Sequence, residues 1–157
     1  MRAAPRPPAP NLSSMDETIS KALARLVAWG RVGIGVSAIA APTLMARPWI
    51  GDPARSSGSR LLARTMGGRD LALGIGALRA LALSDQEARP WVALGGMADA
   101  VDALATVLAF GSLPRYGRWG ILAVTVGAAV VSTRVAVALD APLPGGSDTG
   151  LGATVTR

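Results

Sequence analysis

Residues 91–113 read WVALGGMADAVDALATVLAFGSL, an apolar stretch long enough to cross a membrane as a helix, with two aspartates near its centre. Asp99 and Asp102 are three residues apart, so they lie on the same face of such a helix. A charge at the bilayer centre is costly, at about 2.5–3.5 kcal/mol for each Asp or Arg even on insertion-based scales. Such residues are therefore either paired inside a helix bundle or part of a working site.

A second stretch, residues 61–83 with the sequence LLARTMGGRDLALGIGALRALAL, also carries charges in its interior. An antiparallel arrangement with residues 91–113 brings the middles of the two helices together, with arginines on one helix near aspartates on the other. Arg31 lies in a further apolar stretch, where it either joins this group or, beside Trp29, reaches the lipid headgroups. Three arginines and three aspartates form a balanced set, which burial in a low dielectric requires. The predicted intramembrane polar cluster comprises Arg31, Arg64, Arg69, Asp70, Asp99 and Asp102.

Glycines accompany both charged stretches and predict close contacts between helix backbones. The predicted helix-packing residues are Gly67, Gly68, Gly74, Gly95 and Gly96. An alternative is a helix broken beside Arg69 and Asp70, which would expose backbone groups in the way that transporters build binding sites. We favour a continuous, tightly packed helix.

Four apolar stretches predict an all-α integral membrane four-helix bundle with up-down topology over residues 15–139. The predicted spans are approximately 26–45, 61–83, 91–113 and 119–139. The Pro-rich residues 1–14 and the Gly- and Pro-containing tail 140–157 are predicted to be disordered. Either Met1 or Met15 is the start of the protein.

Composition limits the possible functions. The 157-residue chain is 50% apolar and has no Cys and no His, which excludes disulfides, thiolate catalysis and the usual zinc sites. No metal, cofactor or catalytic residue is predicted, because no histidine is present for a triad and no serine lies in a nucleophile elbow. The net charge of +6 comes from scattered arginines without a basic stripe, which argues against nucleic acid as a partner.

Basic residues that flank apolar helices favour a lipid bilayer as the partner. We expect a multi-pass protein of the bacterial inner (plasma) membrane. An even number of spans places both termini on one side. Arg79 and Arg134, both nearer that side, favour cytoplasmic termini.

The strings ARTMGGRDLALGIGALRALAL and RPWVALGGMADAVDALATVLA resemble small bacterial four-span membrane proteins of unknown function. That family carries a Gly-x-Arg-Asp-Leu-x-x-Gly element in its second helix, which matches Gly67, Arg69, Asp70, Leu71 and Gly74 here, with Gly68 at the variable position. It carries an Asp-x-x-Asp element in its third helix, which matches Asp99 and Asp102. The resemblance covers residues 25–115 and implies the fold and a membrane location, with no established activity. A weaker similarity, in helix number alone, is to DoxX-like membrane proteins associated with redox complexes.

Three functions remain open. The first, which we prefer, is a non-enzymatic structural or accessory membrane protein, as a homo-oligomer or with a membrane-protein partner, whose Arg/Asp cluster fixes helix register. The second is a small carrier of protons, ions or a small solute that uses Asp70, Asp99 and Asp102. The third is a subunit of a membrane redox complex.

Overall fold

The structure is a computed structural model that describes residues 12–139. Of the segments predicted to be disordered, residues 1–14 and 140–157, only residues 12–14 are described, and they form the start of α1. Within this range the prediction of an all-α fold is confirmed. The elements are α1 (Leu12–Ala40), α2 (Pro42–Ile50), the 3₁₀ helix η1 (Asp52–Arg55), α3 (Ser57–Leu81), α4 (Asp85–Leu108) and α5 (Arg115–Ala138).

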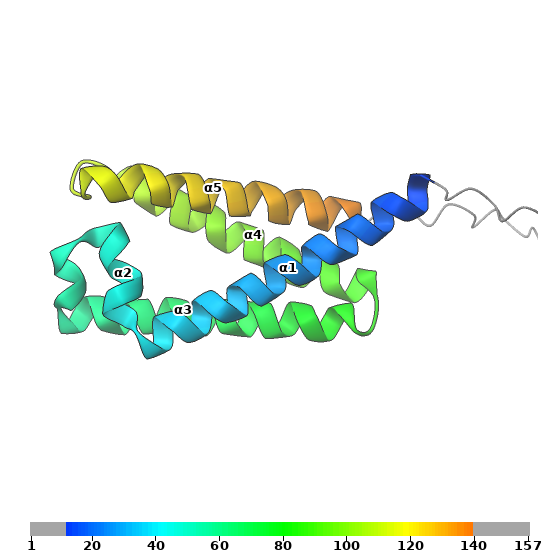
Figure 1. Ribbon diagram of the computed structural model, residues 1–157, viewed down its shortest axis with the longest axis horizontal. Helices are drawn as coiled ribbons and strands as arrows, with labels where there is room; N and C mark the ends of the chain where they lie inside the picture. The colour runs from blue at the N-terminus through cyan, green and yellow to red at the C-terminus, as the bar shows by residue number, and fades with distance from the viewer. Residues whose placement is uncertain (1–11, 140–157) are drawn as a thin grey trace, which may run out of the picture.

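Four long helices run side by side and alternate in direction, while the short helix α2 lies at one end of the bundle (Figure 1). α3 packs between α1 and α4, and α5 packs mainly against α4. The first turns of α1 and the last turns of α5 lie at the opposite end from α2 (Figure 1). We call this end of the bundle the terminal end.

The predicted first span, residues 26–45, is not one helix, because the chain breaks between α1 and α2. Ala41 adopts φ −129° and ψ 61°, and Pro42 is the first residue of α2. Proline lacks an N–H group and disfavours helical geometry in the residue before it. α1 therefore ends at Ala40, and α2 forms a separate helix against α3 and α5.

The other long helices begin before the predicted span starts. α4 begins at Asp85 instead of residue 91 because the side chain of Ser84 caps it, accepting a hydrogen bond from the Glu87 N–H at 3.1 Å. Ser56 caps α3 in the same way. Pro90 lies inside α4 and not at its start.

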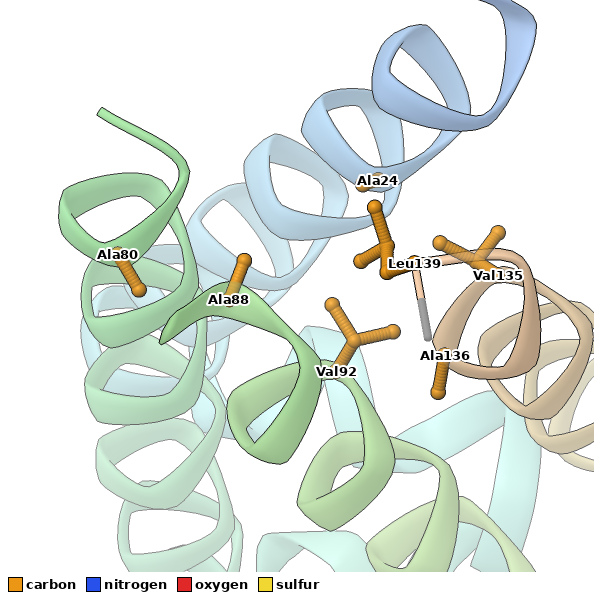
Figure 2. Packing of buried hydrophobic residues seen from close by; sticks show 7 residues of the cluster. All are labelled: Ala24, Ala80, Ala88, Val92, Val135, Ala136 and Leu139. Carbon is orange, nitrogen blue, oxygen red and sulfur yellow. The ribbon is translucent and has the colours of Figure 1, made fainter. Parts of the chain in front are cut away.

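The interior of the bundle is built from small residues, while large apolar residues face outward. Ten of the thirteen buried apolar residues are alanines, and 26 large apolar side chains are exposed, within the residues whose burial the structure describes. At the terminal end, where all four long helices meet, the packed cluster is mostly alanine, with Val92, Val135 and Leu139 as its largest members (Figure 2). A water-soluble protein of this size would bury such side chains, since about 25 cal/mol is gained for each Å² of apolar surface removed from water.

Three helices of the described chain are long and apolar enough to cross a membrane: Thr18–Ala40 in α1, all of α4 (Asp85–Leu108), and Gly117–Ala138 in α5. A helix of 24 residues is about 36 Å long, more than the hydrocarbon thickness of about 30 Å. The exposed apolar surface of the bundle suits lipid instead of water. The protein is thus a multi-pass membrane protein.

Membrane fractionation tests this assignment directly. After an alkaline carbonate wash, a tagged chain is expected to stay in the membrane pellet, since its outward apolar side chains are held by lipid and not by surface charge. The control is a peripheral protein in the same membranes, which the wash should release. Recovery of the chain in the supernatant as a helical monomer would contradict the assignment.

Candidate functional site

The charged side chains of the interior gather half way along the bundle. Arg31 is the fourteenth of the 23 residues of the α1 span, and Arg69 is the thirteenth of the 25 residues of α3. Asp99 is the fifteenth of the 24 residues of α4. α1 and α4 are long and apolar enough to cross a membrane, so the shared depth of these groups places the cluster near the middle of a bilayer.

Arg31 is the centre of the cluster and is buried, with 8% of its surface exposed. Its Nη1 donates a hydrogen bond to Asp70 Oδ1 of α3 at 3.1 Å, and its Nη2 donates to Asp99 Oδ2 of α4. The sequence allowed Arg31 either to join the cluster or to reach the lipid headgroups. In the structure it lies in the cluster. One guanidinium therefore connects α1 to two other helices through ion pairs.

Arg69 provides the second link, between α3 and α4. Its Nη1 and Nη2 donate to Asp102 Oδ1 and Oδ2 at 3.1 and 2.8 Å, a bidentate pair that fixes orientation as well as distance. The same Nη2 lies 3.3 Å from Asp70 Oδ1. Asp70 thus accepts from both arginines and joins the two pairs into one alternating chain of Asp99, Arg31, Asp70, Arg69 and Asp102.

Arg64 lies apart from this chain. Its Nε donates to the carbonyl oxygen of Ile39, near the end of α1, at 3.3 Å, and its side chain is exposed. Arg64 and Arg69 are five residues apart, which places them about 140° apart around a helix. The cluster consequently holds three carboxylates and two guanidinium groups, where the sequence predicted a balanced set of three and three.

The predicted packing glycines differ in what surrounds them. A Cβ added to Gly67 would lie 2.8 Å from the Gly35 carbonyl oxygen, and one added to Gly74 would lie 2.7 Å from that of Ala28, so both sit against the α1 backbone. Gly96 faces Ser132 of α5. Gly68 faces open space. α3 is continuous through these positions, so the helix break considered from the sequence is absent from the described structure.

Gly95 has a role that the sequence did not reveal. A Cβ there would lie 2.7 Å from Nε of Arg31, so the absent side chain makes the space in which the guanidinium lies. Gly95 precedes Asp99 by one helical turn, so the two residues share a helix face. This spacing is the feature of the sequence from which a contact between Gly95 and the cluster could have been predicted. Gly76, on which the ring of Trp91 packs, was also not predicted as a contact.

The cluster pairs charges across helices. It holds one carboxylate more than it holds guanidinium groups, so one further positive charge would make it neutral. Within residues 12–139 no group of His, Cys, Asp and Glu side chains is arranged to hold a metal ion. Fold and cluster together define a multi-pass helical membrane protein with buried arginine–aspartate ion pairs. Comparison with protein-family models, curated proteins and solved structures finds no match for the chain.

Proposed function

We propose that this chain is a non-enzymatic structural or accessory protein of the bacterial inner membrane, in which the ion-pair chain sets the relative positions of α1, α3 and α4. The observation that carries the proposal is that the pairs join all three helices to one another. Arg31 joins α1 to α3 and to α4, and Arg69 joins α3 to α4. Sliding any one of these helices past another by one turn would separate a buried pair.

In this proposal α3 also crosses the membrane, which gives four spans with cytoplasmic termini. α3 has interior charges and is not among the helices that are apolar enough by composition. It nevertheless packs along both α1 and α4, and its mid-helix charges Arg69 and Asp70 are paired with theirs (Figure 1). Charges that are buried and paired within a bundle are the form in which membranes tolerate them.

A second function, a carrier of protons or a monovalent cation, is favoured by the charge count of the cluster. Three aspartates face two arginines, so the site has a net charge of −1 when every group is ionised. A buried net charge in a low dielectric is unfavourable, and binding one proton or cation would remove it.

Reconstitution into liposomes distinguishes the two functions. Under an imposed pH or cation gradient, the wild-type protein is expected to give no flux above that of empty liposomes if the cluster is structural. Asp102→Asn is then expected to lower the unfolding midpoint in detergent, because Arg69 loses its bidentate partner. The matched control is Asp85→Asn, also in α4 but at the terminal end of the bundle. It removes the ion pair in which Lys21 Nζ lies 3.1 Å from Asp85 Oδ2.

The carrier predicts the opposite pattern. Wild-type flux would be clear, and Asp102→Asn would abolish that flux while leaving the unfolding midpoint close to that of the control variant. Such a result would replace the structural proposal with the carrier.

A further inference from the structure

A shallow groove runs between α4 and α5 on the outer surface of the bundle, away from the ion-pair cluster. Its volume is about 520 Å³, and its lining includes Gly96, Met97, Ala100, Ala129 and Val130. Met97 and Val130 are among the exposed large apolar residues, with 59% and 53% of their surface accessible. The groove is therefore open to the lipid and mostly apolar, with Thr133 and Arg134 as the polar residues of its lining.

One end of the groove carries a positive charge. Arg134 of α5 lines it, is exposed, and makes no ion pair with any acidic residue of the described chain. It lies four residues before Ala138, the last residue of α5, or about 6 Å from the helix end. A side chain as long as arginine reaches the headgroup level from that depth.

We infer that the α4–α5 groove is a binding site for one anionic phospholipid. The lipid phosphate lies against the Arg134 guanidinium, which presents paired N–H donors suited to phosphate oxygens. An acyl chain follows the groove from there toward the centre of the membrane and covers Met97, Ala100 and Val130. The lipid headgroup thus lies against a cation, and its acyl chain lies against the apolar part of the groove.

Charge favours a lipid over a second copy of this chain in the groove. A two-fold symmetric dimer uses the same patch on both subunits. With the dimer axis along the membrane normal, the two Arg134 side chains would lie at the same depth on either side of the axis. Like charges so placed repel, whereas an anionic headgroup neutralises the one charge that the groove presents.

Native mass spectrometry of the detergent-solubilised protein, with added phosphatidylglycerol or phosphatidylcholine, tests this site. The wild-type chain is expected to retain one phosphatidylglycerol and to retain phosphatidylcholine weakly. Arg134→Gln is expected to bind phosphatidylglycerol about fivefold more weakly, the effect of one basic residue at an anionic surface. Arg79→Gln is the matched control, since Arg79 is exposed in the last turn of α3, near the same end of the bundle, and does not line the groove.

A second variant tests the apolar part of the site. Ala100 is exposed in the groove, so Ala100→Trp fills the channel without altering the interior and is expected to displace the lipid while Arg134 is still present. Three results would overturn the inference: equal retention of the two lipids, equal loss in Arg134→Gln and Arg79→Gln, or a wild-type dimer that Ala100→Trp converts to monomer.

Discussion

Arg31→Met is expected to lower the free energy of unfolding by about 3–5 kcal/mol, the cost of removing one partner from a buried ion pair. Among the described residues, Arg31 is the only one that links α1 to the cluster by an ion pair. Its loss leaves Asp70 without one of its two guanidinium partners, and it leaves Asp99 without any in this part of the chain. The net charge of the cluster would change from −1 to −2. Denaturant titration in detergent micelles, followed by circular dichroism, measures the effect.

Arg25→Met is the matched control, because Arg25 is exposed on the same helix and has no partner within the described chain. It is expected to change the free energy of unfolding by no more than about 0.5 kcal/mol, as surface substitutions do. The double variant Arg31→Met/Asp99→Asn returns the cluster to a net charge of −1 and is expected to recover part of the loss. An Arg31→Met protein as stable as Arg25→Met would contradict the role given to the cluster.

The sequence predicts those features of the cluster that depend on the spacing of residues along a single helix. Asp99 and Asp102 share a face because of their three-residue spacing, and their place inside an apolar stretch identifies them as buried or paired. Arg64 shows that the number of charges in a stretch does not predict which of them join the cluster. It lies in the same stretch as Arg69, yet the angle between them directs it to the end of α1.

The position of Arg31 depended on the tertiary structure. From the sequence, a site in the cluster and a site at the headgroups were equally consistent with its place in the first apolar stretch. The choice is made by the contact between α1 and α3, where Gly67 and Gly74 allow the backbones to approach, and by the space beside Gly95. None of these contacts is encoded in the residues next to Arg31.

The helix boundaries show a similar division. Residues 32–45 carry no charge, so hydropathy alone joins α1 and α2 into one span. The backbone break at Ala41 follows from the local effect of Pro42 and ends α1 after Ala40. Apolar patterning thus predicts which segments meet lipid, while caps and prolines decide where the helices begin and end.

The neighbouring glycines of α3 are expected to respond to alanine in opposite directions. Gly67→Ala is expected to lower the free energy of unfolding by about 1–3 kcal/mol, the usual cost of overpacking. A Cβ at this position would lie 2.8 Å from the Gly35 carbonyl oxygen and 2.9 Å from the Ala38 Cβ, neither of which moves without shifting α1. Because α1 also holds Arg31, such a shift would stretch the ion pairs to Asp70 and Asp99.

Gly68→Ala is the control that separates packing from helix propensity. A Cβ at Gly68 has no atom within 4 Å, and alanine is favoured over glycine inside a helix by about 0.5–1 kcal/mol. This variant is therefore expected to unfold at a higher denaturant concentration than the wild type, while Gly67→Ala unfolds at a lower one. Shifts in the same direction for both variants would mean that the α1–α3 backbone contact does not hold the helices together, since the two substitutions change the intrinsic helix propensity equally.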